Sequence, residues 1–366
     1  MGIKDLCIRR IDAEVVEEEL ICPFRIAYGQ HECLRNVVLC MELADGTKGY
    51  GEAAIATHIT GETAEDTQNN LKEVGDDLIG IEVSDYLRVC GGLSERLGDN
   101  KAGLAAIEMA MMDALGRAMR VPLWRFFGTK ASRVATDITL VIAEPAETEA
   151  AVRQFYRQGF RKFKVKLEGD PDGDYRRVSI VKRLAAKCTI CLDANQSYSA
   201  EGALEFLRLL QRYYIAPLMI EQPVNRKDWE GLKKVTRLSK VAVCADESVT
   251  CISDVLRLIR EKAADIVNIK LMKFGLLEAR EVARLVKAAG LGLMIGSMME
   301  GNLAATAAAH AASGLGGFDF VDLDTPFFIK GQVRKNPYLN SRGVYSPGEV
   351  RAGIGIVPTF TRPRVR

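Results

Sequence analysis

The sequence predicts an α/β protein: a barrel of eight parallel strands, (β/α)7β, preceded by a smaller α+β domain. Eight short apolar runs recur from about residue 135 onward, spaced 24–28 residues apart, which suits one strand, one loop and one helix per repeat. Amphipathic stretches with helical periodicity separate the runs. No Gly-x-Gly-x-x-Gly segment follows the first run, which disfavours an open nucleotide-binding sheet and favours a closed, modified TIM barrel. The runs are 137–142, 162–167, 189–194, 218–221, 241–246, 266–271, 293–298 and 318–324.

The first 125 residues lack this repeat and predict mixed strands and helices. Residues 3–20 and 35–53 contain extended stretches, and Asp45-Gly46 in the second is a hairpin turn signal. Apolar periodicity then predicts helices over 62–80 and 102–120. We expect this part to form a capping domain on the barrel.

Seven helices are expected between the barrel strands, and none after the last strand. The final run is followed by Pro326-Phe327-Phe328 and a segment rich in glycine and proline. We therefore expect a capping domain over 1–128, a barrel over 129–325 and a C-terminal segment, 326–366, that packs back on the cap. Helices are predicted, for example, over 147–158, 175–187, 200–212 and 276–289.

Composition narrows the class of protein and its partners. Lys and Arg (50) nearly balance Asp and Glu (48), so no single-sign surface is available for a nucleic acid, and no such partner is expected. No apolar run reaches the roughly 18 residues of a membrane helix, so no membrane partner is expected either. The nine cysteines are an odd, scattered set, which favours a reducing cytoplasm over a disulfide framework. A homo-oligomer is left open.

Three carboxylates close three consecutive runs. Asp193, Glu221 and Asp246 stand at the carboxyl ends of the third, fourth and fifth runs. Because neighbouring strands lie about 4.8 Å apart, these side chains should converge, and their mutual repulsion calls for a cation. Oxygen ligands favour a hard ion, so we predict a Mg²⁺ site there. Glu247, beside Asp246, is expected to orient a lysine rather than to bind the metal.

The second and sixth runs both contain lysine. Lys162, Lys164 and Lys166 alternate with apolar residues, so they share one strand face, and we expect at least the last two to point into the barrel mouth. Repulsion and partial burial should lower an ammonium pKa there, as a lysine base requires. Lys270 repeats the arrangement on the sixth run.

The geometry of an eight-stranded barrel predicts where the lysines and the last two aspartates lie relative to one another. The second and sixth strands lie on opposite sides of an eight-stranded barrel, so Lys166 and Lys270 should face each other. The eighth run lies opposite the fourth and ends in Asp322-Leu323-Asp324, with both aspartates on one face. The expected ligand carries a carboxylate at one end, an ammonium at the other, and a middle carbon open to attack from both faces.

These motifs together resemble the enolase superfamily, muconate-lactonizing enzyme subgroup, over essentially the whole chain. The shared patterns are K-x-K, D-x-N, E-Q-P, D-E and N-x-K, in that order. Asp322-Leu323-Asp324 resembles the D-x-D motif of dipeptide epimerases, whose carboxylates bind the substrate's α-ammonium. Residues 296–300 (GSMME) resemble their seventh-strand segment, and residues 59–62 (ITGE) resemble their capping loop.

The resemblance implies a Mg²⁺-dependent 1,1-proton transfer on a small-molecule dipeptide. Mg²⁺ and Lys164 would bind the C-terminal carboxylate, and Lys166 or Lys270 would remove the α-proton of the C-terminal residue. The resulting enediolate would be stabilised by the metal, and the opposite lysine would return a proton to the other face. We also expect Thr139 and Ser297, polar residues of the first and seventh runs, to contact the substrate.

Two alternatives and one question of specificity remain at this point. A muconate cycloisomerase, o-succinylbenzoate synthase or N-acylamino acid racemase would act on substrates without a free ammonium, which two aspartates would disfavour. A non-catalytic barrel that binds a metal carboxylate would need no second lysine. The arginine that meets the glutamate side chain in L-Ala-D/L-Glu enzymes aligns near Gly29, and Met298 and Met299 are apolar. Both an L-Ala-D/L-Glu specificity and a hydrophobic or broad one stay open, with a slight preference for the latter.

Overall fold

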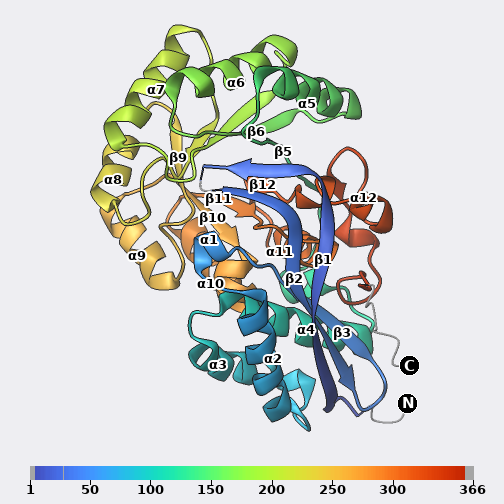
Figure 1. The fold of residues 1–366 in the computed structure, drawn as a ribbon. Helices are drawn as coiled ribbons and strands as arrows, with labels where there is room; N and C mark the ends of the chain where they lie inside the picture. Colours follow the sequence, from blue (N-terminus) through green and yellow to red (C-terminus); the bar gives the residue numbers. More distant parts are fainter. Residues whose placement is uncertain (1–4, 28, 359–366) are drawn as a thin grey trace.

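The computed structural model describes residues 5–27 and 29–358, and it confirms the predicted barrel (Figure 1). The eight strands pair in parallel in chain order from β5 to β12. The first and last strands meet where Asp137 N donates to Val321 O at 2.9 Å. The strands are β5 (Ile138–Leu140), β6 (Lys162–Lys166), β7 (Thr189–Asp193), β8 (Met219–Glu221), β9 (Ala242–Ala245), β10 (Ile266–Lys270), β11 (Gly292–Gly296) and β12 (Phe320–Asp322).

Seven helices connect these strands and cover the outside of the barrel (Figure 1). Local sequence explains where several begin: Ser199 and Asp228 accept N-terminal backbone N–H groups, and Pro145 and Pro171 stand at first helical positions. The helices are α5 (Pro145–Gln158), α6 (Pro171–Leu184), α7 (Ala200–Arg212), α8 (Trp229–Leu238), α9 (Ile252–Glu261), α10 (Leu271–Ala288) and α11 (Asn302–Leu315).

Helix α10 begins five residues earlier than the sequence predicts. Its first turn is separated from the rest by a kink at Gly275, whose φ of +69° favours glycine. The buried Glu108 caps the helix beyond the kink by accepting from the backbone N–H groups of Leu276 and Leu277. The kink thus lets a short turn follow Lys270 before the long helix starts.

The N-terminal part is a three-stranded antiparallel sheet followed by helices. Strand β1 (Ile8–Ile26) pairs with β2 (Gly29–Leu43), which pairs with β3 (Lys48–Ala53) through the predicted turn at Asp45-Gly46. Gly46 has a φ of +84°, as that turn requires. Two helices, α1 and α3, were not predicted. The helical segments are α1 (Thr57–Thr60), α2 (Ala64–Leu78), η1 (Val83–Asp85), α3 (Tyr86–Leu97), α4 (Lys101–Met119) and η2 (Leu123–Phe126).

The tip of the β1–β2 hairpin lies over the mouth of the barrel (Figure 1). Arg25 O accepts from Ile142 N at 3.2 Å, and Ile21 N donates to Phe328 O at 2.7 Å. These bonds tie the hairpin to the loop after β5 and to the segment that follows β12. The cap therefore forms one wall of any cavity at the barrel mouth.

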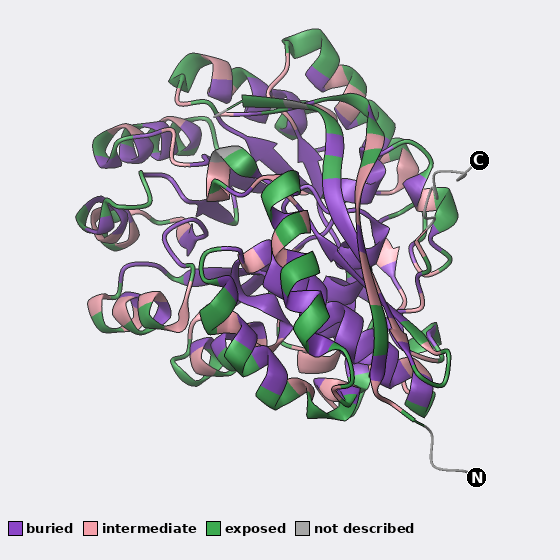
Figure 2. Cartoon of the chain, turned by 60° about the horizontal axis from the view of Figure 1, so that its bottom comes forward, coloured by how far each residue is buried: buried purple, intermediate pink, exposed green. Residues whose placement is uncertain are grey.

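The remaining chain contacts both parts of the molecule. After η3 (Thr325–Phe327), α12 (Gln332–Lys335), β13 (Val344–Tyr345) and η4 (Pro347–Glu349), the chain returns to α4, where Ile354 N donates to Asp113 at 2.6 Å. Strand β13 pairs with β4 (Val134–Ala135). Figure 2 shows the barrel strands buried and the outer faces of the surrounding helices exposed. No helix of the described part is long and apolar enough to cross a membrane.

Candidate active site

The barrel interior has an apolar floor beneath a charged upper layer. The floor is a buried cluster of side chains from five neighbouring strands: Cys191, Met219, Cys244, Ile266 and Met294. Two residues further along each of four of these strands, the inward position holds Asp193, Glu221, Asp246 or Asn268. The strands thus lift the polar groups to the carboxyl end of the barrel, where enzymes with this architecture hold their sites.

Asp193, Glu221 and Asp246 lie on three neighbouring strand ends, as expected. Asp193 is in register with Glu221, and Asp246 directly follows β9. All three are almost fully buried, at 1%, 0% and 1% exposure. Burial, followed by repulsion from Asp193, raises the pKa of Glu221 to about 8. This site disfavours a third negative charge unless a cation joins it.

Lysine ammonium groups supply positive charge to this layer. Lys164 Nζ lies 2.9 Å from Asp193 Oδ2, 2.8 Å from Glu221 Oε2 and 2.6 Å from Asp322 Oδ2, and so joins two groups of carboxylates. Lys166 Nζ donates to Asp193 Oδ2 at 2.7 Å and to Asn195 Oδ1 at 3.0 Å.

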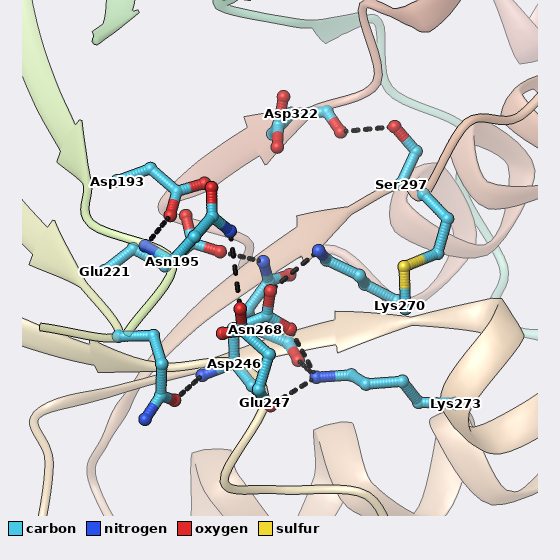
Figure 3. Close-up of polar contacts among 12 residues, drawn as sticks. Asp193, Asn195, Glu221, Asp246, Glu247, Asn268, Lys270, Lys273, Ser297 and Asp322 are labelled. Atoms are coloured by element: carbon cyan, nitrogen blue, oxygen red, sulfur yellow. Dashed lines mark hydrogen bonds and ion pairs between the residues drawn. The ribbon is translucent and has the colours of Figure 1, made fainter. Parts of the chain in front are cut away.

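A second pair of lysines holds Asp246 (Figure 3). Lys270 Nζ lies 2.7 Å from Asp246 Oδ2, and Lys273 Nζ lies 2.7 Å from Oδ1 of the same carboxylate. Lys273 also donates to the main-chain oxygens of Asp246 and Asn268, each at 2.8 Å. The sequence did not single out Lys273, which reaches the site from the short turn before the Gly275 kink.

The expected lowering of the lysine pKa is wrong for Lys164 and Lys270. Burial by itself disfavours their charged forms, yet the pKa of each lies above its ordinary value. For Lys164 the cause is the charge of Asp193, Asp322 and Glu221, and for Lys270 it is chiefly Asp246. The prediction considered repulsion between lysines but not their ion pairs with the carboxylates.

The opposite wall carries the D-x-D motif and one aspartate that the sequence did not single out. Oxygens of Asp137, Asp322 and Asp324 lie within 4.8 Å of one another. Asp324 Oδ2 accepts from Thr139 N at 2.5 Å, while Asp137 Oδ1 is buried and accepts no hydrogen bond from the described residues. Burial and then repulsion by Asp322 raise the pKa of Asp324 to about 7. The three carboxyl groups crowded in this wall repel one another when ionised, so the wall favours a cationic group.

Ser297 lies beside the D-x-D motif. Its hydroxyl donates to Asp322 O at 3.1 Å (Figure 3) and lies 3.1 Å from the hydroxyl of Thr325. In this structure the hydroxyl therefore positions the strand end.

One cavity connects the two walls. It is lined by Lys166 from β6 and Lys270 from β10, four strands apart in the sheet, so the two ammonium groups approach from different sides. Asp193, Glu221 and Asp246 are not among the residues that line it. Five of the predicted site residues also line it, Thr139, Lys164, Ser297, Asp322 and Asp324, together with the apolar side chains Phe24, Ile26, Ile59, Met298 and Met299.

The donor set at β7–β9 fits a divalent cation in its chemistry. Three buried carboxylates on adjacent strands, each paired to at least one lysine, are hard oxygen ligands that already attract positive charge. Among the described residues, however, the carboxylates that converge within 4.8 Å are those of the D-x-D wall and Asp137. The metal assignment to Asp193, Glu221 and Asp246 therefore stays a prediction.

Supporting residues were partly visible in the sequence. Asn195 belongs to the D-x-N motif, and its amide donates to Glu247 Oε1 at 3.3 Å while its carbonyl holds Lys166. Glu247 thus acts on a lysine through Asn195, which refines the expectation that it orients one. Asp137 had no local signal, because only closure of the barrel brings β5 beside β12.

Comparisons with known proteins agree with this geometry. Residues 10–128 match the model of the mandelate racemase/muconate lactonizing enzyme N-terminal domain, and residues 147–361 match the enolase C-terminal domain-like model. A hydrophobic dipeptide epimerase of Citrifermentans bemidjiense is 43% identical, over 95% of this chain and 97% of its own. An aromatic dipeptide epimerase of Herpetosiphon aurantiacus is 38% identical, over 95% and 98%.

Solved structures of dipeptide epimerases are also similar to this chain in fold. A dipeptide epimerase from Enterococcus faecalis, complexed with Mg and the dipeptide L-Leu-L-Tyr, has a TM-score of 0.89 and 30% identity, covering 95% of this chain and 99% of that one. The L-Ala-D/L-Glu epimerase of Bacillus subtilis, solved with substrate, has a TM-score of 0.91 and 29% identity, covering 96% and 99%.

Proposed function

This chain belongs to the mandelate racemase/muconate lactonizing enzyme family of the enolase superfamily, and we infer that it is a dipeptide epimerase that inverts the α-carbon of the C-terminal residue. The observation that carries this inference is one cavity with Lys166 and Lys270 on different sides and Asp322 and Asp324 on a third. The relatives named as dipeptide epimerases support it over the cycloisomerase and N-acylamino acid racemase alternatives. Buried aspartates beside an uncharged acyl group would also be unfavourable.

Binding begins at the two charged ends of the substrate. We propose that Asp322 and Asp324 accept the α-ammonium and that Lys164 contacts the C-terminal carboxylate. Asp193, Glu221 and Asp246 would hold Mg²⁺, a metal present in related structures. When bound there, the cation would supply electrostatic stabilisation for negative charge on the substrate carboxylate.

Proton transfer would be the task of the two opposed lysines. Either Lys166 or Lys270 takes the α-proton from one face, and the other delivers a proton to the opposite face. Asn195 fixes Lys166, while Asp246 fixes Lys270. Because both lysines are buried and held, the reacting groups are positioned before the substrate arrives.

The C-terminal side chain would meet an apolar surface. Phe24, Ile26, Ile59, Met298 and Met299 line the cavity, and no arginine does so among the described residues. We therefore propose apolar dipeptides as substrates rather than those ending in glutamate. The hydrophobic and aromatic dipeptide specificities named for two relatives support this preference.

A dipeptide library tests the reaction and the preference together. The enzyme is incubated with Mg²⁺ and L,L-dipeptides in D₂O, and each product is scored for a mass gain of one deuterium and for a new diastereomer. We expect both signals, strongest for apolar C-terminal residues. Exchange confined to N-acylated amino acids would contradict the proposal and favour the racemase alternative.

A further inference from the structure

A second, larger cavity lies next to the reaction cavity. Its volume is about 390 Å³, compared with about 50 Å³ for the inner one, and lies in the range of small-molecule pockets. It is enclosed by the C-terminal part of β1, the loop after β5, one face of α5 and the segment after β12. Its lining includes Ile21, Thr139, Val141, Ile142, Ala151 and Phe328.

The chemistry of this outer cavity is that of an apolar binding site. Val141, Ile142, Ala151 and Phe328 supply walls without charge, and Ile21 at the entrance is 60% exposed. Charged side chains on the cavity are few and of both signs, so no net charge selects an ionic ligand. An exposed apolar surface that adjoins a reaction site favours an apolar part of a ligand.

The outer cavity is continuous with the place where the substrate ammonium is expected. Thr139 lines both cavities, and its backbone N–H holds Asp324. Phe24 and Phe328 meet edge to face, with ring centroids 5.0 Å apart, and form the partition between the two spaces. Since Phe328 follows Asp324 by four residues, the same short segment builds the ammonium site and the wall of the outer cavity.

We propose that this outer cavity is the subsite for the side chain of the N-terminal residue, and that it takes a large aliphatic or aromatic one. The inference rests on the proposed dipeptide epimerase function. In a dipeptide, the ammonium and the N-terminal side chain share one α-carbon. An ammonium held at Asp322 and Asp324 therefore directs that side chain either back into the crowded inner cavity or past Thr139 into the outer one.

The size of the two spaces decides between these directions. The inner cavity must accept the C-terminal residue, and its free volume is small while the lysines and carboxylates are paired. The outer cavity has several times that volume and apolar walls. The enzyme is thus expected to read both side chains of its substrate, each in a separate apolar space.

Filling the outer cavity tests this assignment. Ala151 lines it from the middle of α5, and Ala151→Phe would occupy part of it without touching the reaction cavity. The matched control is Ala146→Phe, at an exposed position of the same helix outside the cavity lining. Both variants are compared with the wild type on L-Leu-L-Leu and L-Ala-L-Leu, which differ only in the N-terminal side chain.

We expect Ala151→Phe to reduce kcat/KM for L-Leu-L-Leu at least tenfold, because a filled hydrophobic pocket rejects a few methylene groups by roughly that factor or more. Activity on L-Ala-L-Leu should stay within about twofold, and Ala146→Phe should match the wild type on both substrates. If Ala151→Phe does not fold, Ala150→Phe, at an exposed position that also lines the cavity, replaces it.

Other outcomes would overturn the proposal in distinguishable ways. Equal effects of Ala151→Phe on the two dipeptides would reject the subsite while leaving the epimerase function intact. Equal effects accompanied by loss of an oligomer in light scattering would assign the cavity to a second copy of the chain. If the wild type epimerises neither dipeptide nor any other in the library, the proposed function itself fails, and the subsite with it.

Discussion

Removing either of the opposed lysines should abolish epimerisation while sparing exchange at one face. In Lys166→Ala, the remaining Lys270 can still remove the α-proton from the epimer whose C–H bond faces it, and the reverse holds for Lys270→Ala. Each variant should therefore exchange the α-proton of one diastereomer with solvent deuterium and leave the other unlabelled. The two variants should show opposite preferences between the L,L and L,D forms of one dipeptide.

The expected losses of rate and of folding stability have different sizes. Loss of a general acid–base group costs roughly 10²–10⁴-fold in rate, about 3–5 kcal/mol in activation free energy. The effect on folding should be smaller than the roughly 3–5 kcal/mol of an orphaned buried charge. Asp193 keeps Lys164 at 2.9 Å when Lys166 is truncated, and Asp246 keeps Lys273 at 2.7 Å when Lys270 is truncated.

The assay is deuterium incorporation in D₂O followed by NMR and mass spectrometry, with thermal unfolding as the check on folding. Lys162→Ala is the matched control, because Lys162 is an exposed lysine on the same strand as Lys166, and it should behave as the wild type. Equal exchange of both diastereomers in both folded variants would refute the two-base scheme.

Three further predictions follow from the buried charges. Asp322→Asn and Asp324→Asn should each lower kcat/KM for free-amine dipeptides at least tenfold, because each loses a charge-assisted contact to the ammonium. Neither should lower kcat/KM for the N-acetylated dipeptides. Steady-state kinetics with both kinds of substrate checks this. Burial raises the pKa of Glu108 to about 7 from 4.5, so the stability linked to its proton is fully present below about pH 4.5 and is lost as pH rises through 7. Between pH 4.5 and pH 8 the wild type should lose up to about 3 kcal/mol of unfolding free energy through this group, whereas Glu108→Gln should not. Urea unfolding at the two pH values measures the difference. Lys164→Met should bind Mg²⁺ more tightly by calorimetry yet turn over poorly, because one ammonium no longer competes for Asp193 and Glu221.

Each of these has a contradicting result. Equal losses on free and acetylated dipeptides would mean that the aspartates support the fold rather than the ammonium. A pH dependence unchanged in Glu108→Gln would place the titration elsewhere. Weaker Mg²⁺ binding in Lys164→Met would mean that the metal site lies elsewhere than at Asp193 and Glu221.

The barrel could be predicted from the sequence because each strand is a short apolar run with its own polar end. The predicted run 189–194 matches β7, Thr189–Asp193, and the predicted helix 200–212 matches α7. The unpredicted α3, Tyr86–Leu97, contains the pair Gly91-Gly92, which lowers helix propensity, and packing against α4 stabilises it. A local sequence pattern does not predict a helix that depends on tertiary contacts for its stability.

The same distinction applies to the site. Alternation along β6 was enough to predict that Lys164 and Lys166 enter the barrel, because that depends on one strand alone. Lys273 and Asp137 could not be predicted in this way. The first depends on a kink in α10 and the second on the contact between the first and last strands, and neither has a sequence signal near it.

Lys164 explains how the two charged ends of the site can depend on each other. Its single ammonium contacts Asp193 and Glu221 on one side and Asp322 on the other, all within 2.9 Å. A cation that competes for the first two carboxylates leaves more of that positive charge for the third, which then attracts a substrate ammonium less strongly. The substrate carboxylate has the opposite effect, because it offers Lys164 a new partner and frees Asp322. Binding at one end therefore changes the free energy of binding at the other, and by linkage the effect is mutual. A zwitterionic dipeptide, which brings both charges at once, satisfies this arrangement better than an N-acylated amino acid can.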